Sequence, residues 1–350
     1  MRNKEYPILF NTGTKPWGSE DSDVTSSSYK DINYTDYEFS QATTVDGGVP
    51  TRRRRVGDRL KTARRLLFEA TELSYDPELD IDWDAPLSSG MHWLAPHRVS
   101  LYGTPEWGAL SVEQRDELAR QELVSLLSFV VDAQGALASL MFRDVIEGNT
   151  LADDYTRFLL ASVRDISRNA TMVGRLINKT GLELVPAPMA VQRLQRFFVP
   201  LIPHGPLGRG FILLLHRLIH QLMSELEADE QAQPVVRQVA KICVLVGRRQ
   251  LEFAEDELYR AVDARRYLPA APADISVALL TVLATSLIVR PQVYRSVGLT
   301  ERAGRRAAAR SENSRHRNQV LLRRYLDIAQ DAGMFTTSAA RSILGGRGLL

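Results

Sequence analysis

Apolar residues recur at steps of three and four residues through most of the chain, which is the spacing of one buried face on an α-helix. The pattern is strongest in residues 111–142, 152–178, 208–230, 234–257 and about 274–289. Because the helical pattern continues from one stretch to the next, it predicts an all-α protein built around one large core rather than two small ones.

Four parts of the chain lack this period. Residues 1–50 are rich in Ser, Thr, Asp, Tyr and Gly, so they cannot bury enough apolar surface to offset the entropy of ordering, and we expect a disordered or loosely ordered leader. Residues 76–108 are loop-rich, and prolines break a connection at residues 180–206. We expect a flexible C-terminal tail at residues 336–350. The sequence therefore predicts a single helical domain over residues 51–335.

Charge and composition narrow the classes of partner and compartment. The 350 residues include 44 basic and 42 acidic side chains, and this balance gives no overall field that would attract nucleic acid or anionic lipid. Cys243 is the one cysteine, so no internal disulfide forms, which suits a reducing compartment. The longest apolar run, residues 275–289, is shorter than the roughly 20 residues of a membrane span. We expect a cytoplasmic protein that contacts neither nucleic acid nor membrane.

The helix predicted at residues 234–257 presents one face of small and mostly neutral residues. Cys243, Gly247 and Gln250 lie on this face, while arginines, a lysine and acidic residues occupy most of the remainder. Gly247 stands out because a glycine in mid-helix costs on the order of 1 kcal/mol relative to alanine. It indicates close packing or a missing side chain.

The sequence around this face resembles that of a known family. Residues 234–258 read P-x-VR-x-VAKI-C-x3-G-RR-Q-x-EFA-x-DEL, which is similar to the last ligand helix of the AurF-like (p-aminobenzoate N-oxygenase) family of diiron enzymes. DPELDIDW at 76–83 and SLYGTPEWGALS at 100–111 are similar to segments that precede the first ligand helix in the CmlI-like branch. The resemblance covers most of residues 56–335 and implies a ferritin-like helical bundle with additional helices and a loop-rich N-terminal segment.

The resemblance also locates the positions at which the family holds its two irons. Carried over residue by residue, these seven positions fall on Gln134, Ile166, Asn169, His216, Cys243, Gly247 and Gln250. None is a carboxylate, and an amide can neither supply the charge of a carboxylate nor bridge two irons. If the metals are lost, any carboxylate left behind is an unpaired buried charge, so neutral replacements are expected in a metal-free core. We therefore expect no cofactor.

Several functions stay open. The family oxidises amines in natural-product pathways with dioxygen and two irons, but these seven residues supply no redox centre. One hypothesis is a metal-free homologue that binds or transforms a pathway intermediate by cyclisation, isomerisation or dehydration. His216 would then be the acid or base, Cys243 a nucleophile, and Gln134, Asn169 and Gln250 hydrogen-bond donors.

The alternatives differ in class. The chain could be a pseudoenzyme that supports a biosynthetic partner protein or pairs with a second copy of itself. It could also be a diiron N-oxygenase with a rebuilt site, or hold a different metal on His216, His220 and Cys243. Pocket volume separates the first two hypotheses, because a closed apolar core favours a scaffold and an open cavity of several hundred cubic ångströms favours small-molecule handling.

Overall fold

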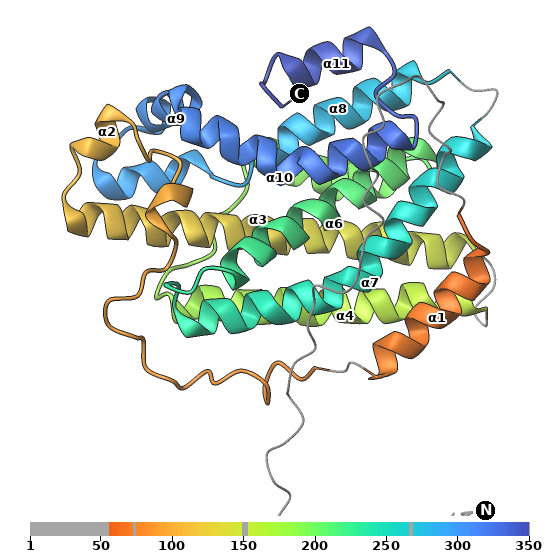
Figure 1. Cartoon of the computed structure of the whole chain (residues 1–350), viewed down its shortest axis with the longest axis horizontal. Helices are drawn as coiled ribbons and strands as arrows, with labels where there is room; N and C mark the ends of the chain where they lie inside the picture. The colour runs from red at the N-terminus through yellow and green to blue at the C-terminus, as the bar shows by residue number, and fades with distance from the viewer. Residues whose placement is uncertain (1–55, 73–74, 149–152, 266–268, 350) are drawn as a thin grey trace, which may run out of the picture. The chain divides into compact units, whose positions relative to one another are not determined.

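The computed structural model describes residues 56–72, 75–148, 153–265 and 269–349, and the leader predicted at residues 1–50 lies outside them. Secondary structure in the described residues is helical apart from one isolated bridge between His92 and Ala232. The α-helices are α1 (Arg59–Glu72), α2 (Pro105–Gly108), α3 (Val112–Glu147), α4 (Asp154–Lys179), α5 (Met189–Phe198), α6 (Pro206–Glu227), α7 (Pro234–Ala264), α8 (Ala271–Ser286), α9 (Glu301–Arg310), α10 (Glu312–Asp331) and α11 (Ser338–Gly345), and three 3-10 helices are η1 (Pro96–Arg98), η2 (Val199–Leu201) and η3 (Pro291–Val297) (Figure 1).

Four long helices, α3, α4, α6 and α7, form a central bundle that we call the cage (Figure 1). Helices α3 and α4 form one antiparallel pair and α6 and α7 another, whereas residues 180–205 run back along the bundle between α4 and α6. A four-helix bundle with one long crossover is the ferritin-like topology. The prediction of an all-α, ferritin-like bundle with additional helices is confirmed.

Local capping explains where the cage helices begin. Ser111 and Gln114 form a capping box at the start of α3, each side chain accepting a hydrogen bond from the other's backbone N–H. Asp153 caps α4 by accepting from the backbone of Thr156 at 2.7 Å. Helices α6 and α7 each carry a proline in the first turn, where no backbone donor is required.

The loop-rich segment before α3 packs on the bundle through its tryptophans. Trp83 is buried, and its indole donates to the carbonyl of Pro77 at 2.8 Å. Trp93 and Trp107 pack against the core with part of their surface exposed. Lys179 at the end of α4 donates to the carbonyl of Trp83 at 2.7 Å and so ties the segment to the cage.

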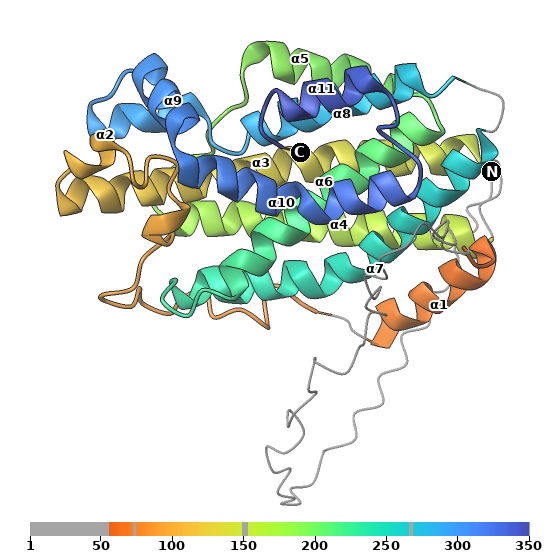
Figure 2. The same ribbon diagram turned by 45° about the horizontal axis from the view of Figure 1, so that its top comes forward.

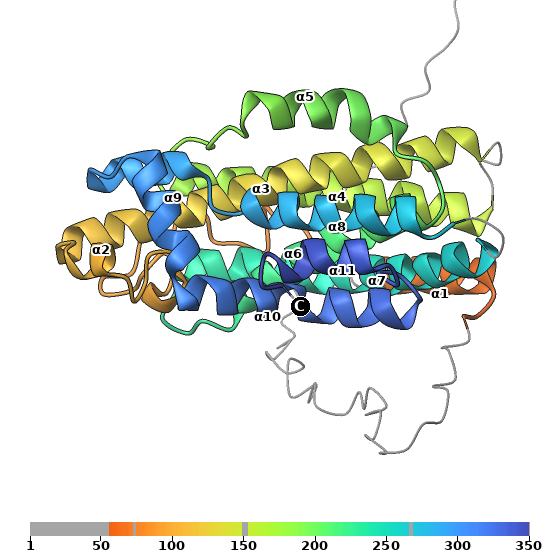
Figure 3. The ribbon, with the colours of Figure 1, turned by 90° about the horizontal axis from the view of Figure 1, so that it is seen from above.

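The remaining helices lie outside the cage. Helices α8 and α10 pack on α6, and α11 packs on α8 (Figure 2). Helix α5, which lies within the proline-broken connection, runs along the outside of the bundle (Figure 3). The tail predicted at residues 336–350 instead contains α11, whose Ala340 and Leu344 are fully buried because they lie four residues apart on one helical face. The prediction of a flexible tail is corrected at these positions.

Two described segments are long and apolar enough to cross a membrane by length and composition alone. They are Val112–Glu147, which contains α3, and Ala271–Val297, which contains α8, with mean hydropathies of 1.7 and 1.9. The apolar window of the first is 72% buried and that of the second 33% buried. A core helix of a bundle passes the same test, so these two segments are weak evidence for a membrane.

Candidate functional site

The seven family ligand positions all lie on the cage helices. Six of them are buried, with exposed fractions of 3 to 6%: Gln134 on α3, Ile166 and Asn169 on α4, His216 on α6, and Cys243 and Gln250 on α7. Gly247 is half-buried. Gln250 donates to the carbonyl of Ser162 at 3.4 Å and so links α7 to α4. These residues are part of the packed interior rather than of a surface.

The two reactive side chains among them are held in unreactive forms. Burial, with a smaller contribution from His220, lowers the pKa of His216 to about 3, and burial raises the pKa of the Cys243 thiol to about 12. His216 Nε2 and Gln134 Oε1 are buried without a hydrogen-bond partner among the described residues. At neutral pH the imidazole is uncharged and weakly basic and the thiol is protonated, so neither is tuned for acid–base or nucleophilic work.

The donor set does not fit a pair of irons. Two primary amides from glutamine, one from asparagine, an imidazole, a thiol, an alkyl chain and a glycine replace the carboxylates and imidazoles of the family. Within the described ranges no three His, Cys, Asp or Glu residues come together in a way that could hold a metal ion. This also counts against the alternative site of His216, His220 and Cys243, and we derive no step through a metal.

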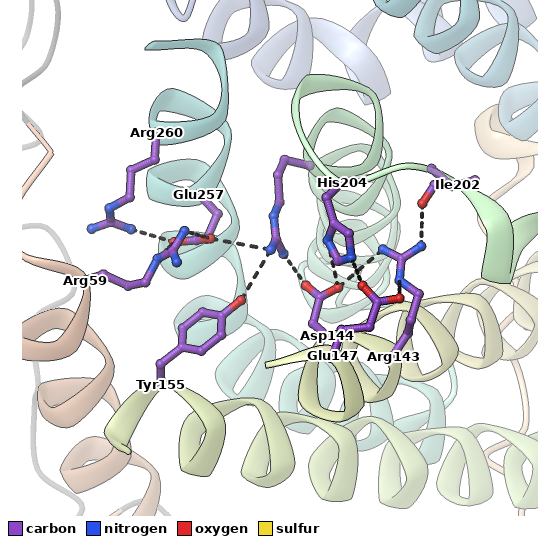
Figure 4. A network of polar contacts seen from close by, with 10 residues as sticks. Arg59, Arg143, Asp144, Glu147, Tyr155, Ile202, His204, Glu257 and Arg260 are labelled. Carbon is purple, nitrogen blue, oxygen red and sulfur yellow. Dashed lines mark hydrogen bonds and ion pairs between the residues drawn. The ribbon is translucent and has the colours of Figure 1, made fainter. Parts of the chain in front are cut away.

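Carboxylates do converge in the cage, but at one end of it and around an arginine. We call this group the Arg209 cluster, and each cage helix supplies one of its members (Figure 4): Asp144 from α3, Tyr155 from α4, Arg209 from α6 and Glu257 from α7. Arg209 Nη1 lies 2.7 Å from Asp144 Oδ2, and Arg209 Nη2 lies 3.7 Å from Glu257 Oε2. Arg209 Nη2 also donates to the Tyr155 hydroxyl at 3.3 Å.

Further arginines complete the charge balance of the cluster. Arg59 donates to both oxygens of Glu257 at 2.8 Å, and Arg260 donates to one of them at 2.8 Å. The side chains of Asp144 and Glu257 are only 2% and 1% exposed, so their charges need close cations. Guanidinium groups supply the cations in this cluster, which lies about two to three helical turns from the positions at which the resemblance places the metal ions.

A cavity of about 320 Å³ lies on the other side of α3 and α6, outside the cage. Residues of α3, α5, α6 and α8 line it, and its wall is mostly apolar, as shown by Phe129, Ala136, Leu194, Phe211 and Leu283. None of the seven ligand positions belongs to this lining. The cavity therefore lies next to the cage and does not contain the residues at the former ligand positions.

Arg290 and Asp132 are the charged residues in the cavity wall. Arg290 is 1% exposed and donates through Nη2 to Asp132 Oδ2. Its Nε and Nη1 are buried and have no hydrogen-bond partner among the described residues. Sequence reasoning missed both residues because they are 158 positions apart, and only a charge placed directly after the apolar run at residues 275–289 hinted at Arg290.

Comparisons with known proteins agree with the class that the fold defines, a ferritin-like bundle with additional helices. A family model described as "P-aminobenzoate N-oxygenase AurF" matches residues 57–333, which is most of the chain. The protein therefore belongs to the AurF family.

Two other comparisons add little. Among solved structures, the chain is similar to a mutant of R2-like ligand-binding oxidase with an aerobically reconstituted Mn/Fe cofactor, at 10% identity and a TM-score of 0.38, over 83% of this chain and 92% of the other. At that score the likeness carries no argument. No match was found among curated proteins.

Proposed function

We propose that this chain is a metal-free member of the AurF family that binds a small apolar molecule in the cavity between α3, α5, α6 and α8. The observation that carries the proposal is the cavity itself. Its volume of about 320 Å³ falls within the roughly 300–1,000 Å³ of small-molecule sites. Like such sites, it combines an apolar wall with a few polar groups.

The donor set at the former ligand positions supports the metal-free part of the proposal. Replacement of every carboxylate there removes the charge that would hold two irons, while Arg209 serves as the cation for the acidic residues nearby. Such a chain has no redox centre at those positions for the activation of dioxygen.

We limit the proposal to binding. Cyclisation, isomerisation or dehydration at His216 and Cys243 would need a working base or thiolate, and burial opposes both. It would also need room for a substrate beside them, and neither residue lines the cavity.

A second candidate is a non-catalytic partner of another biosynthetic protein. It is favoured by large apolar side chains that are more than half exposed on α5 and η2, namely Met189, Phe197, Phe198 and Leu201. Exposed apolar clusters of this kind are typical of surfaces that bind other proteins. Because Phe198 also lines the cavity, this surface adjoins the proposed ligand site.

Titration with N-phenyl-1-naphthylamine, a neutral apolar dye that fluoresces in dry sites, tests the proposal. We expect saturable binding of one dye per chain. The variant Ala136→Phe fills the cavity and should weaken binding by at least about tenfold, which equals 1.4 kcal/mol. The matched variant Ala309→Phe adds the same ring to an exposed position on α9 and should bind as the wild type does. Absence of saturable binding, or equal weakening in both variants, would refute the proposal.

A further inference from the structure

The outward side of α5 and η2 carries large apolar side chains that no other described part of the chain covers. Met189, Phe197 and Leu201 are 64%, 59% and 74% exposed. Each would gain free energy by leaving water, so several of them on one short stretch indicate a surface that binds something apolar. We call Met189, Phe197 and Leu201, together with the two arginines beside them, the α5 face.

The same face is positively charged. Arg193 and Arg196 are both exposed, and they follow Met189 at steps of four and three residues, so they share its side of the helix. The Arg196 guanidinium carbon lies 5.6 Å from the centre of the Phe197 ring. Residues 189–201 contain no acidic side chain. The face is therefore basic, although the charges of the whole chain nearly balance.

The mouth of the apolar cavity opens next to this face. Phe198 on α5 and Leu279 on α8 both line the cavity, and they are 61% and 54% exposed, so they lie where it meets the surface. Helix α8 belongs to the apolar segment Ala271–Val297, whose most apolar window is only 33% buried. Both helices lie on the outside of the bundle (Figures 2 and 3). The mouth is therefore bordered by exposed apolar surface from two helices.

Hydrogen bonds hold the α5 face in place on the bundle. Gln195 donates to the backbone carbonyl of Asp132 on α3 at 3.3 Å, and Arg143 on α3 donates to the carbonyl of Pro200 in η2 at 3.2 Å. Val191 and Leu194 on the inward side of α5 line the cavity. The exposed side chains therefore project from an anchored helix.

We infer that the α5 face docks on the surface of an anionic lipid bilayer, with Arg193 and Arg196 on lipid phosphates and Phe197 and Leu201 among the acyl chains. A helix that combines basic and large apolar side chains lies in the membrane interface, and each basic residue near an anionic surface strengthens binding by about fivefold. The chain lies on the bilayer and does not cross it. This docking differs from the expectation of no membrane contact, which rested on the charge of the whole chain.

The position of the cavity favours a bilayer over a protein partner. Apolar molecules concentrate in bilayers, so a mouth that faces the lipid lets such a molecule enter without crossing water. The inference goes beyond the proposed function, because it names the surface on which the chain works and the source of an apolar ligand. It does not require that the cavity be occupied.

Co-sedimentation of the full chain with lipid vesicles tests the inference. The vesicles are made of phosphatidylcholine alone or with about 30% phosphatidylglycerol, which adds the negative charge. We expect the anionic vesicles to bind at least about tenfold more tightly than the neutral ones, and high salt to remove most of this difference. Equal binding to both compositions, or no binding to either, would overturn the inference.

An apolar variant and its control locate the contact. Phe197→Glu replaces the ring with an anion and should weaken binding to anionic vesicles by at least about tenfold. Phe68→Glu makes the same change on α1, where the side chain is 62% exposed, and should bind as the wild type does. Equal weakening in the two variants would overturn the assignment to the α5 face.

A basic pair and its control test the charge. The double variant Arg193→Gln with Arg196→Gln should weaken binding to anionic vesicles by about 25-fold, which is fivefold for each arginine. Arg305→Gln with Arg306→Gln removes two exposed arginines from α9 and should leave binding unchanged. A loss of the same size in both double variants would mean that only the net charge of the chain matters, which contradicts docking by this face.

Two further measurements separate this inference from other occupants and from the proposed function. A dimer that Phe197→Glu converts to a monomer, in a chain that binds no vesicles, would show that a second copy covers the face. Phe197 does not line the cavity, so Phe197→Glu should still bind N-phenyl-1-naphthylamine in the absence of lipid. If the wild type binds anionic vesicles but not the dye, the proposed function fails and docking stands. If it binds the dye but not the vesicles, docking fails and the ligand site stands.

Discussion

Acid should destabilise the protein through His216, because this buried histidine is neutral in the folded chain. Burial lowers its pKa from 6.5 to about 3, whereas the unfolded chain protonates it near 6.5. Between those two values the unfolded state binds more protons than the folded state. The free energy of unfolding must therefore fall as the pH decreases from about 6.5 towards 3.

The size of the effect follows from proton linkage. Lowering the pH from 7.5 to 5 leaves folded His216 neutral but protonates it almost fully in the unfolded chain, which removes about 2 kcal/mol of stability. The figure is set by the pKa of the unfolded chain and by the final pH. His220, whose pKa burial lowers to about 4, adds a similar pH dependence that is shared by wild type and variant.

Urea unfolding at the two pH values, on wild type and His216→Leu, measures this quantity. The variant removes the titrating group and should lose about 2 kcal/mol less than the wild type between pH 7.5 and pH 5. The exposed histidine in His316→Gln serves as the control and should leave the wild-type difference unchanged. Equal pH dependence in wild type and His216→Leu would refute the claim that His216 is buried and neutral in the folded protein.

Two further substitutions test the cage at other points. Arg209→Met removes the cation between Asp144 and Glu257 and should lower the free energy of unfolding by about 3 kcal/mol at pH 7, measured with urea, because it leaves a buried carboxylate short of a partner. Gly247→Ala should raise the free energy of unfolding by about 0.5–1 kcal/mol, and with it the melting temperature. Helix propensity improves, and the added Cβ would meet only His220 Cδ2, at 3.8 Å.

Matched substitutions show what would contradict these two predictions. Arg157→Met removes an arginine that is 61% exposed and should change the free energy of unfolding by less than about 0.5 kcal/mol. If Arg209→Met lowers the free energy of unfolding no more than Arg157→Met does, the Arg209 cluster does not stabilise the fold. Gly304→Ala should destabilise by about 1–3 kcal/mol, because its Cβ would overlap the ring of Tyr294. A comparable loss in Gly247→Ala would mean that the cage packs more tightly there than the structure shows.

Helical periodicity alone predicted most of the fold. The steps of three and four residues located the starts of the cage helices to within two residues and their ends to within seven, because each has one broad buried face. The departures come from short elements. Helix α5 has only ten residues and no fully buried side chain, and α11 has eight, so neither gave a periodic signal long enough to stand out. Ser311 separates α9 from α10, because its hydroxyl caps the start of α10.

The candidate site could be predicted only in part. The segments that resemble the family pointed to His216 and the other six ligand positions, and the structure buries six of these seven. The cavity could not be predicted, because its wall combines helices that are distant in sequence and brings Arg290 to Asp132 across 158 positions. The Arg209 cluster was missed for the same reason. Asp144 lies just beyond the helical stretch predicted at residues 111–142, and nothing in the sequence indicated that Arg209 would lie between it and Glu257.

The metal content of the purified protein tests the central claim most directly. Iron should be measured by elemental analysis before and after incubation with Fe(II) under anaerobic conditions, followed by removal of free metal and a melting curve. The account predicts no stoichiometric iron and no rise in melting temperature, since a metal that bound the folded state would raise it. Two irons per chain with a raised melting temperature would contradict it.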